Sequence, residues 1–238
     1  MQRSILPTAF PPASLPPGAA IAARLLPVPG MGGDFYDVIR LPANRLGLVA
    51  AGVSGLGVPA ALFMMRLHQL VREAATSGAG PADCLARINQ ALCADNPLDL
   101  SATLFLALLE PATGALTYAS AGHVMPVWQS ADGVIRALPA ATGAVLGMFS
   151  ETMFTQASVM LGVGDRMMLH ARGVAGVTAP DGTPFGLERL HSALLEGRHV
   201  EPVRALDHVI EHLRYFAAGA AQQNDIACVV VDRIAAAG

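Results

Sequence analysis

The stretch ATLFLALLEPATGALTYASAGH, residues 102–123, decides the fold of this chain. It sets two apolar, β-prone runs on either side of PATG, a segment that is typical of a tight hairpin turn. A shorter pair of runs follows around ADG at 131–133. ASVMLGVGDRMMLHARG at 157–173 then indicates two more strands, linked by the GVGD turn. The middle of the chain is therefore predicted to be a series of antiparallel strands.

Helical patterns lie on both sides of these strands. The pattern at 58–78 begins with Pro59 in its first turn and is predicted to place Leu62, Met65 and Leu70 on its core face. The remaining segments are a helix at 81–95, helices at 185–197 and 203–217, and strands at 21–28, 46–55 and 225–233. Strands, two helices, many strands, two helices and a last strand favour an α+β domain over a doubly wound parallel sheet.

Composition excludes several classes of protein. Of the 238 residues 53% are apolar and 14% charged, which is too apolar for a disordered chain, and the net charge of −3 gives no basic footprint for nucleic acid. Cys84, Cys93 and Cys228 form no CxxC pair, so neither a disulfide framework nor a cysteine-based zinc site is indicated. Every apolar run is shorter than the roughly 18 residues of a membrane span, and the start lacks the order of a signal peptide. We expect a cytoplasmic protein that binds neither membrane nor nucleic acid.

The chain is expected to hold one domain. Residues 1–20 are rich in proline and predicted to be an extended lead-in, the end of an upstream linker. Residues 21–235 show neither a repeat nor an internal linker, and are predicted to form a single domain.

Six stretches, taken in order, resemble a known family. They are GGDFYDV (32–38), VSGLGVPAALFM (53–64), the hairpin at 102–123, LGVGDRMMLHARG (161–173), FGLERL (185–190) and NDIACVVV (224–231). Together they resemble the PPM-type (protein phosphatase 2C-like) serine/threonine phosphatases, in the branch of stage II sporulation protein E and the stress-response sigma-factor phosphatases. The resemblance implies a βα sandwich of two packed antiparallel sheets flanked by helices.

The resemblance also implies a chemistry. In this family two Mn²⁺ or Mg²⁺ ions sit on aspartates, and a water between them attacks the phosphorus of the substrate. Four aspartate positions are expected, and the chain keeps only the first, as Asp34. The others are Gly52, Arg172 and Asn224, and Ala227 replaces the threonine of the last motif.

Three missing carboxylates predict a degenerate site. Arginine keeps its charge at physiological pH, so a guanidinium near a dication repels it. The prediction is a pseudophosphatase with no confident catalytic residue and no cofactor. Binding is assigned to the former site, namely Gly33, Asp34, Arg172, Gly173 and Asn224. If the chain is active, Mn²⁺ or Mg²⁺ would be held by Asp34 and Asp225, with Asn224 and water, although Asp225 is expected to face away from Asn224.

Several alternatives stay open for single residues. Asp34 could cap the amides of its glycine loop, pair with Arg172 in place of the metals, or hold one metal ion. His123 matches a family position but is interpreted as structural, and His170 as a packing residue. Asp37 is interpreted as stabilising its loop. On the helix at 58–78, Arg66, Arg72 and Glu73 are interpreted as a solvated face.

Three functions are weighed. The first is a protein-binding regulatory module in bacterial signalling, whose partner would be an anti-sigma antagonist, or a sigma factor handled by an adaptor. Its binding surface would comprise the segments 30–37, 52–57 and 172–184 and the helix at 59–76. The second is an active metal-dependent phosphoserine/phosphothreonine phosphatase with an unorthodox site. The third is a sensor whose Arg172 receives an anion. By resemblance, QRSILP at 2–7 would end a linker helix through which two copies could pair.

Overall fold

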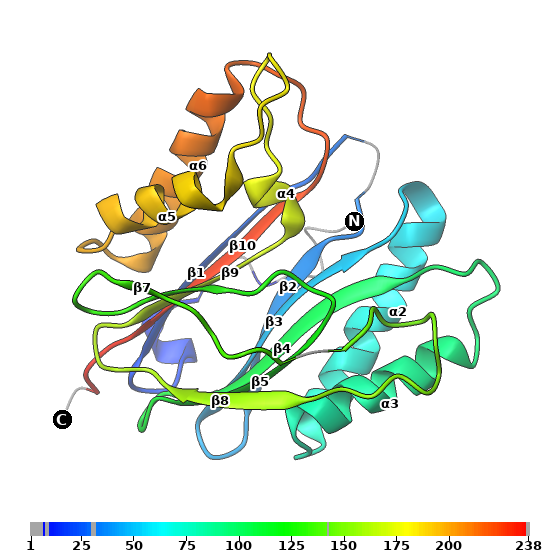
Figure 1. Cartoon of the computed structure of the whole chain (residues 1–238). Helices are drawn as coiled ribbons and strands as arrows, with labels where there is room; N and C mark the ends of the chain where they lie inside the picture. Colours follow the sequence, from blue (N-terminus) through cyan, green and yellow to red (C-terminus); the bar gives the residue numbers. More distant parts are fainter. Residues whose placement is uncertain (1–6, 8–9, 30–31, 142, 237–238) are drawn as a thin grey trace.

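Two five-stranded antiparallel sheets pack face to face in the computed structural model, which describes residue 7 and residues 10–29, 32–141 and 143–236 (Figure 1). The strand order is β1-β10-β9-β6-β7 in the first sheet and β2-β3-β4-β5-β8 in the second. The strands are β1 (Ala19–Leu26), β2 (Phe35–Leu41), β3 (Arg45–Val53), β4 (Ala102–Glu110), β5 (Ala115–Ala121), β6 (Val127–Gln129), β7 (Ile135–Arg136), β8 (Gln156–Met160), β9 (Arg166–His170) and β10 (Ile226–Arg233). The predicted α+β sandwich is confirmed.

Helices cover the outer face of each sheet. In Figure 1, α2 (Gly57–Thr76) and α3 (Pro81–Cys93) lie beside the second sheet, and α5 (Gly186–Glu196) and α6 (Pro202–Ala217) lie on the far side of the first. A short helix, α4 (Arg172–Ala175), follows β9, and a single 3₁₀ turn, η1 (Pro12–Ser14), precedes β1. None of the helices in the described part of the chain combines the length and apolarity needed to cross a membrane.

Burial follows this layering. One apolar cluster joins the facing sides of the two sheets to α2 and α3, and includes Phe35, Leu67 and Phe105, which are buried. A second cluster lies between the first sheet and α5 and α6, around Leu190 and Leu206. The amphipathic pattern of each helix therefore faces its sheet, as the helical spacing of its apolar residues requires.

The central hairpin forms as predicted. Strands β4 and β5 pair from Phe105 opposite Ser120 to Glu110 opposite Ala115, and the turn between them closes when the Gly114 amide donates to the Glu110 carbonyl at 2.7 Å. Gly114 has φ of +83°, and a β-carbon there would lie 2.2 Å from the Leu161 carbonyl oxygen. Glycine is thus required both by the backbone conformation and by the close approach of the next segment.

The predicted core face of the helix at 58–78 was wrong for Leu62 and Met65. Leu62 and Met65 of α2 are exposed and Leu70 is half-buried, because the face of α2 that packs on the sheet is the one with Ala60, Phe63, Met64, Leu67 and Val71. The small alanines of that face let the helix approach the sheet closely, a preference that a count of large apolar residues does not detect.

The strands on either side of the GVGD turn belong to different sheets. Strand β8 pairs with β5, whereas β9 pairs with β10 and β6, so this turn connects the two layers of the sandwich. Because β9 and β10 are antiparallel, the end of β9 places Arg172 at the end of the sandwich where β10 begins.

The predicted lead-in at 1–20 falls partly on residues that the structure does not describe, so the linker at 2–7 stays a prediction. Strand β1 begins at Ala19, two residues before the predicted start of the domain, and Ala19 pairs with Arg233 of β10. The Pro7 carbonyl accepts a hydrogen bond from the Tyr36 hydroxyl at 3.0 Å, so this part of the lead-in contacts the second sheet.

Candidate functional site

Strand ends from both sheets enclose a pocket of about 280 Å³ at one end of the sandwich. All four predicted site positions line it: Asp34 before β2, Gly52 in β3, Arg172 after β9 and Asn224 before β10. The other lining residues are Val53, Ser54, Ser101, Thr103, Gly122, His123, Val124, Val145 and Gly173. The structure therefore brings together residues that lie far apart in the sequence, from Asp34 to Asn224.

Glycines hold the loops of the pocket together. A β-carbon on Gly173 would lie 2.0 Å from the Asp225 carbonyl oxygen, and one on Gly33 would lie 2.8 Å from Cβ of Val53. The turn after β9 therefore packs directly on the backbone before β10, and the loop before β2 packs on β3. The predicted binding residues Gly33 and Gly173 shape the pocket through this close backbone approach.

Asp34 is the one carboxylate among the described residues that line the pocket. The pKa of Asp34 is raised to about 7, mainly by burial and also by the nearby charge of Asp225, while Arg172 acts to lower it.

Gly52 faces Asp34 directly. A β-carbon on Gly52 would lie 2.6 Å from Oδ1 of Asp34 and 3.4 Å from Oγ1 of Thr103. The position therefore points into the pocket, as the resemblance implies for a ligand. Any side chain at position 52 would displace the Asp34 carboxyl from its present place. The carboxyl of Asp34 thus occupies space that a second carboxylate at position 52 would need.

Arg172 is exposed at the rim of the pocket, at the start of α4. The ion pairs within 4.0 Å among the described residues do not include one between Arg172 and Asp34, so the pair that was one of three alternatives for Asp34 is not formed in this structure. The guanidinium still lowers the pKa of Asp34 through space. It contributes positive charge to the pocket mouth without replacing a buried metal cluster.

Asp225 turns away from the pocket, as predicted for the neighbour of Asn224. It is buried, and its carboxylate accepts hydrogen bonds from the Val28 amide at 2.8 Å and the Asp34 amide at 3.1 Å. A β-carbon on Gly32 would lie 1.9 Å from one of its oxygens. Asp225 therefore fixes the loop between β1 and β2, and with it the position of Asp34.

His123 is a satisfied structural histidine. One ring nitrogen, Nε2, lies 3.2 Å from the His170 carbonyl, which can only accept, so Nε2 carries the proton and donates. Its Nδ1 therefore accepts from the Thr103 hydroxyl at 2.9 Å. Burial lowers the pKa of His123 to about 4, helped by His170 and Arg172, so the ring is neutral. It lines the pocket as a hydrogen-bonded wall.

His170 is a packing residue in the structure. The ring is 1% exposed, and its Nδ1 lies 3.2 Å from the Ala171 carbonyl oxygen. Within the described part of the chain its Nε2 is buried without a hydrogen-bond partner. Burial lowers the pKa of His170, which keeps the ring uncharged beside the pocket.

Asp37 anchors a helix and not its loop, which corrects the expectation for it and for Arg72. Its fully buried carboxylate accepts from Nε of Arg72 at 2.7 Å and from Nε2 of His68 at 2.9 Å. Burial alone would raise the pKa of Asp37, but the hydrogen bonds from His68 and Arg72 lower it below its usual value. Arg72 and His68 are thus tied to β2, and the C-terminal half of α2 is held on the second sheet.

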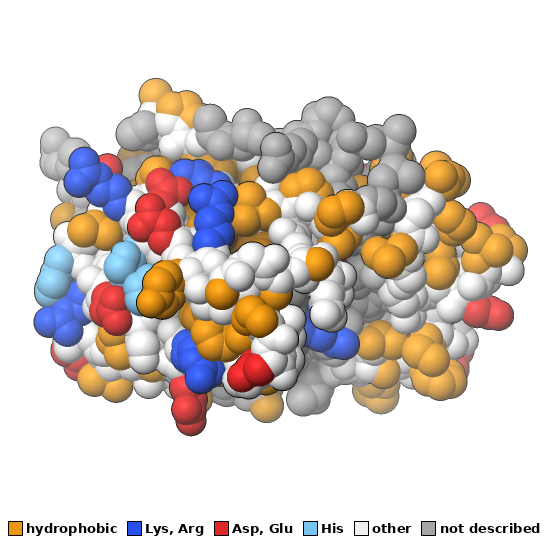
Figure 2. Space-filling view, turned by 90° about the horizontal axis from the view of Figure 1, so that it is seen from above, with side chains coloured by type: hydrophobic (Ala, Val, Ile, Leu, Met, Phe, Trp, Pro, Cys, Tyr) orange, Lys and Arg blue, Asp and Glu red, His pale blue; other side chains and the backbone are white. Residues whose placement is uncertain are grey.

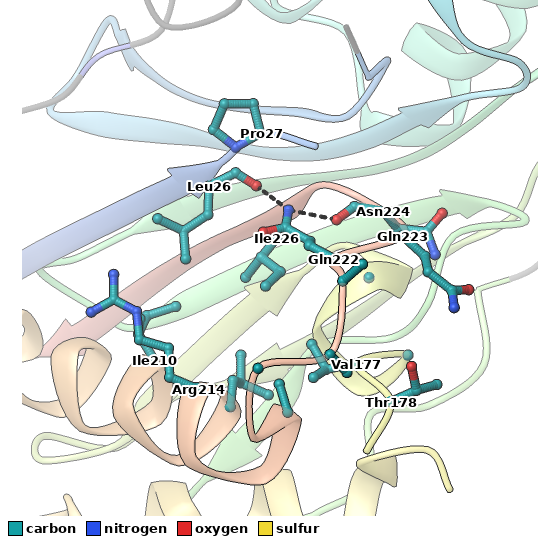
Figure 3. A pocket seen from close by; sticks show the side chains of 17 residues that line it. Leu26, Pro27, Val177, Thr178, Ile210, Arg214, Gln222, Gln223, Asn224 and Ile226 are labelled. Atoms are coloured by element: carbon teal, nitrogen blue, oxygen red, sulfur yellow. Dashed lines mark hydrogen bonds between the residues drawn. The ribbon is translucent and has the colours of Figure 1, made fainter. Parts of the chain in front are cut away.

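A second and larger pocket, of about 720 Å³, was not anticipated from the sequence (Figure 3). It shares Gly173 and Asn224 with the first pocket and runs beside α6, with Leu26 and Ile226 on its sheet side. In Figure 3 the Gln222 side chain joins the end of β1 to the segment before β10, donating to the carbonyls of Leu26 at 2.8 Å and Asn224 at 2.7 Å. The only sequence signal was the run of small and polar residues at 217–224, which marks a loop.

Comparison with known proteins agrees with this geometry. The profile of the family "Stage II sporulation protein E (SpoIIE)" matches residues 42–234. Protein IcfG of Synechocystis is 26% identical over 240 residues, covering 90% of this chain and 38% of its own length. Phosphoserine phosphatase RsbP of Bacillus subtilis is 28% identical over 153 residues, covering 63% of this chain and 38% of its own length. The chain thus spans well under half of each of these relatives.

A solved structure shares the fold. The RsbU and RsbW domains of Rv1364c from Mycobacterium tuberculosis superpose with a TM-score of 0.80 at 25% identity, covering 94% of this chain and 62% of that one. The two-sheet sandwich seen here is therefore the one that the sequence resemblance implied.

Proposed function

Because the chain belongs to the stage II sporulation protein E family, whose domains are protein phosphatase 2C-like, we propose that it is a pseudophosphatase that binds a protein partner in bacterial signalling. The family match extends from residue 42 to residue 234 and so includes every strand of the two sheets except β1 and β2. The observation that carries the proposal is the donor set of the 280 Å³ pocket, where the family's catalytic metals would lie.

The residues of that pocket do not fit a pair of divalent cations. Mn²⁺ and Mg²⁺ are hard ions that take carboxylate and water oxygens, and two of them carry about four positive charges. The described lining offers one carboxylate, Asp34, and one amide, Asn224, while Gly52 offers no side chain and Arg172 adds a positive charge. Asp225 is already occupied with the amides of Val28 and Asp34.

The scaffold of the site is retained although the ligands are lost. Gly33 and Gly173 still allow the close backbone contacts that form the pocket, and Asp225 still fixes the loop that carries Asp34. The close backbone contacts are kept while three carboxylates are missing, and this combination supports a role in recognition. Hydrolysis would need a charge arrangement that these side chains do not supply.

The surface of α2 supports protein binding. Leu56 beside it and Val58 and Leu62 within it are exposed by 65%, 58% and 62%. The segment after β7 returns to this helix, since a β-carbon on Gly147 would lie 3.4 Å from the Phe63 ring, and it exposes Met148 and Phe149. Exposed apolar side chains gathered on one helix and its neighbouring loop are typical of a protein-binding surface.

We infer the partner class from the relatives. RsbP is a phosphoserine phosphatase, and a protein partner carrying phosphoserine or its unmodified form is the corresponding choice for this chain. An anti-sigma antagonist, or a sigma factor handled by an adaptor, is the class we propose. The partner would contact the rim at 172–184, the turn at 52–57 and α2.

A phosphatase assay tests the proposal. The purified chain would be incubated with Mn²⁺ or Mg²⁺ and either a phosphoserine protein or p-nitrophenyl phosphate. We expect no turnover above the level of the Asp34→Ala variant. Metal-dependent turnover that Asp34→Ala abolishes would show an active phosphatase with an unorthodox site and would overturn the proposal. Saturable binding of inorganic phosphate that Arg172→Ala abolishes, without turnover, would favour the anion sensor instead.

A further inference from the structure

Three side chains of types that can bind metal meet on the outer helices, and none of them lines either pocket. His208 and His212 lie four residues apart on α6, and Glu196 ends α5. The spacing i, i+4 places both imidazoles on one face of the helix, one turn apart. Their ligand atoms and one Glu196 oxygen all lie within 4.8 Å of one another.

The distances match the shape of a metal site. Oε2 of Glu196 lies 3.2 Å from Nε2 of His208 and 3.3 Å from Nε2 of His212. In a tetrahedral site with metal–ligand bonds of about 2.0–2.1 Å, neighbouring ligand atoms are about 3.3–3.4 Å apart. Two of the three edges are therefore already at the required length. The third edge, between the ligand atoms of the two histidines, is at most 4.8 Å long, and the ring centroids are 4.5 Å apart, so a bound ion would have to draw the two rings closer.

We propose that Glu196, His208 and His212 form a binding site for a zinc ion that links α5 to α6. Two imidazoles and one carboxylate are the ligand set of three-ligand zinc sites, whose fourth position is taken by water. Imidazole nitrogen favours Zn²⁺ over Mg²⁺ and Mn²⁺, which prefer oxygen, so this site would select a metal different from the family's catalytic ions.

The fourth position of the proposed site faces solvent. Glu196 is exposed, with 56% of its side chain accessible, and the two histidines are about one-third accessible. In Figure 2 the charged and histidine side chains gather over the half of the face formed by α5 and α6, whereas the other half is mostly hydrophobic or uncharged. The bound ion could therefore take water or a donor atom from another molecule.

The site would couple two helices that otherwise meet through apolar contacts. Leu190, Leu194 and Leu206 pack in the cluster beneath them. A metal bridge at the surface adds binding free energy to the folded state only, so it raises the apparent stability of the chain. Residues Ile210 and Arg214 of α6 also line the larger pocket, so the bridge would restrain one of its walls (Figure 3).

The test is titration of the chain, free of any histidine tag, with Zn²⁺ alone, followed by calorimetry and thermal unfolding. We expect one Zn²⁺ per chain and a rise in Tm, with Co²⁺ at the same site giving the absorption bands of a four-coordinate ion. Glu196→Gln, His208→Ala and His212→Ala should each weaken binding by at least about 100-fold, since even groups that only orient ligands contribute about 10–100-fold.

The control is His199→Ala, which removes an exposed histidine from the α5–α6 connection outside the cluster. Zn²⁺ binding by this variant should equal that of the unaltered chain. The proposal is overturned if the unaltered chain shows no saturable binding, or if binding survives in His208→Ala and His212→Ala. Glu196→Gln serves if an alanine variant fails to fold, because it keeps the shape and an acceptor oxygen while removing the charge.

Discussion

Removing the Asp225 carboxylate should cost the chain much of its stability, because two loop amides donate to it. In Asp225→Ala the amides of Val28 and Asp34, which now donate to the carboxylate at 2.8 and 3.1 Å, would lose their acceptor. Each buried donor left unpaired costs about 1–3 kcal/mol. The expected loss in the free energy of unfolding is therefore about 2–6 kcal/mol, a large part of the usual total of about 5–15 kcal/mol.

Urea unfolding followed by circular dichroism measures this loss. The midpoint should fall in Asp225→Ala with an unchanged m value, and Asp225→Asn, which keeps one acceptor oxygen, should lose about half as much. Asp207→Ala is the matched control, because Asp207 pairs with Arg24 at the surface, where such pairs contribute about 0–1 kcal/mol. A loss in Asp225→Ala no larger than that of Asp207→Ala would refute the assigned role of Asp225.

Three further predictions follow from the site and its supports. The folded-state pKa of Asp34 is raised to about 7 from 3.8, so between these pH values the folded chain holds a proton that the unfolded chain releases, and stability should fall as pH rises from about 4 to 7. In Asp34→Asn the urea midpoint should therefore fall less between pH 5 and pH 8 than it does in the unaltered chain. An equal fall in the two proteins would contradict the raised pKa. Asp37→Ala should cost about 1–3 kcal/mol in urea unfolding, because it leaves the Arg72 and His68 donors without their acceptor, and a neutral result would remove the proposed anchor of α2. Gly173→Ala should cost more than Gly47→Ala, whose β-carbon would lie 3.4 Å from its nearest neighbour against 2.0 Å at Gly173, and equal thermal midpoints for the two variants would argue against the tight turn.

Much of the fold was predictable because local patterns and their order agreed. The hairpin around PATG, the helix with Leu85, Ile88 and Leu92 on its buried face, and the last strand all formed where their apolar patterns indicated. The buried face of α2 was mispredicted, because Ala60 and Ala61 pack where larger residues were expected.

The residues that line the candidate site could be predicted from the sequence, but the directions and contacts of their side chains could not. The family resemblance placed Asp34, Gly52, Arg172 and Asn224 together, and they line one pocket. The sequence could not show that Arg172 stays exposed, because the direction of a long side chain depends on packing around it. The link from Asp225 to Val28 spans 197 positions and has no local signal.

The histidine cluster illustrates the same limit. His208 and His212 have a helical ligand spacing that is visible in the sequence. Glu196 joins them only because α5 and α6 turn back on each other, so the third ligand emerges from the structure.

The central claim is that the phosphatase-like pocket has lost its metal ions, and Mn²⁺ titration followed by electron paramagnetic resonance tests it most directly. The signal of free Mn²⁺ falls when the ion binds to protein, so the titration counts bound ions. We predict that the unaltered chain and Asp34→Ala bind Mn²⁺ to the same extent at every concentration. Binding of Mn²⁺ by the unaltered chain that Asp34→Ala abolishes would contradict the account.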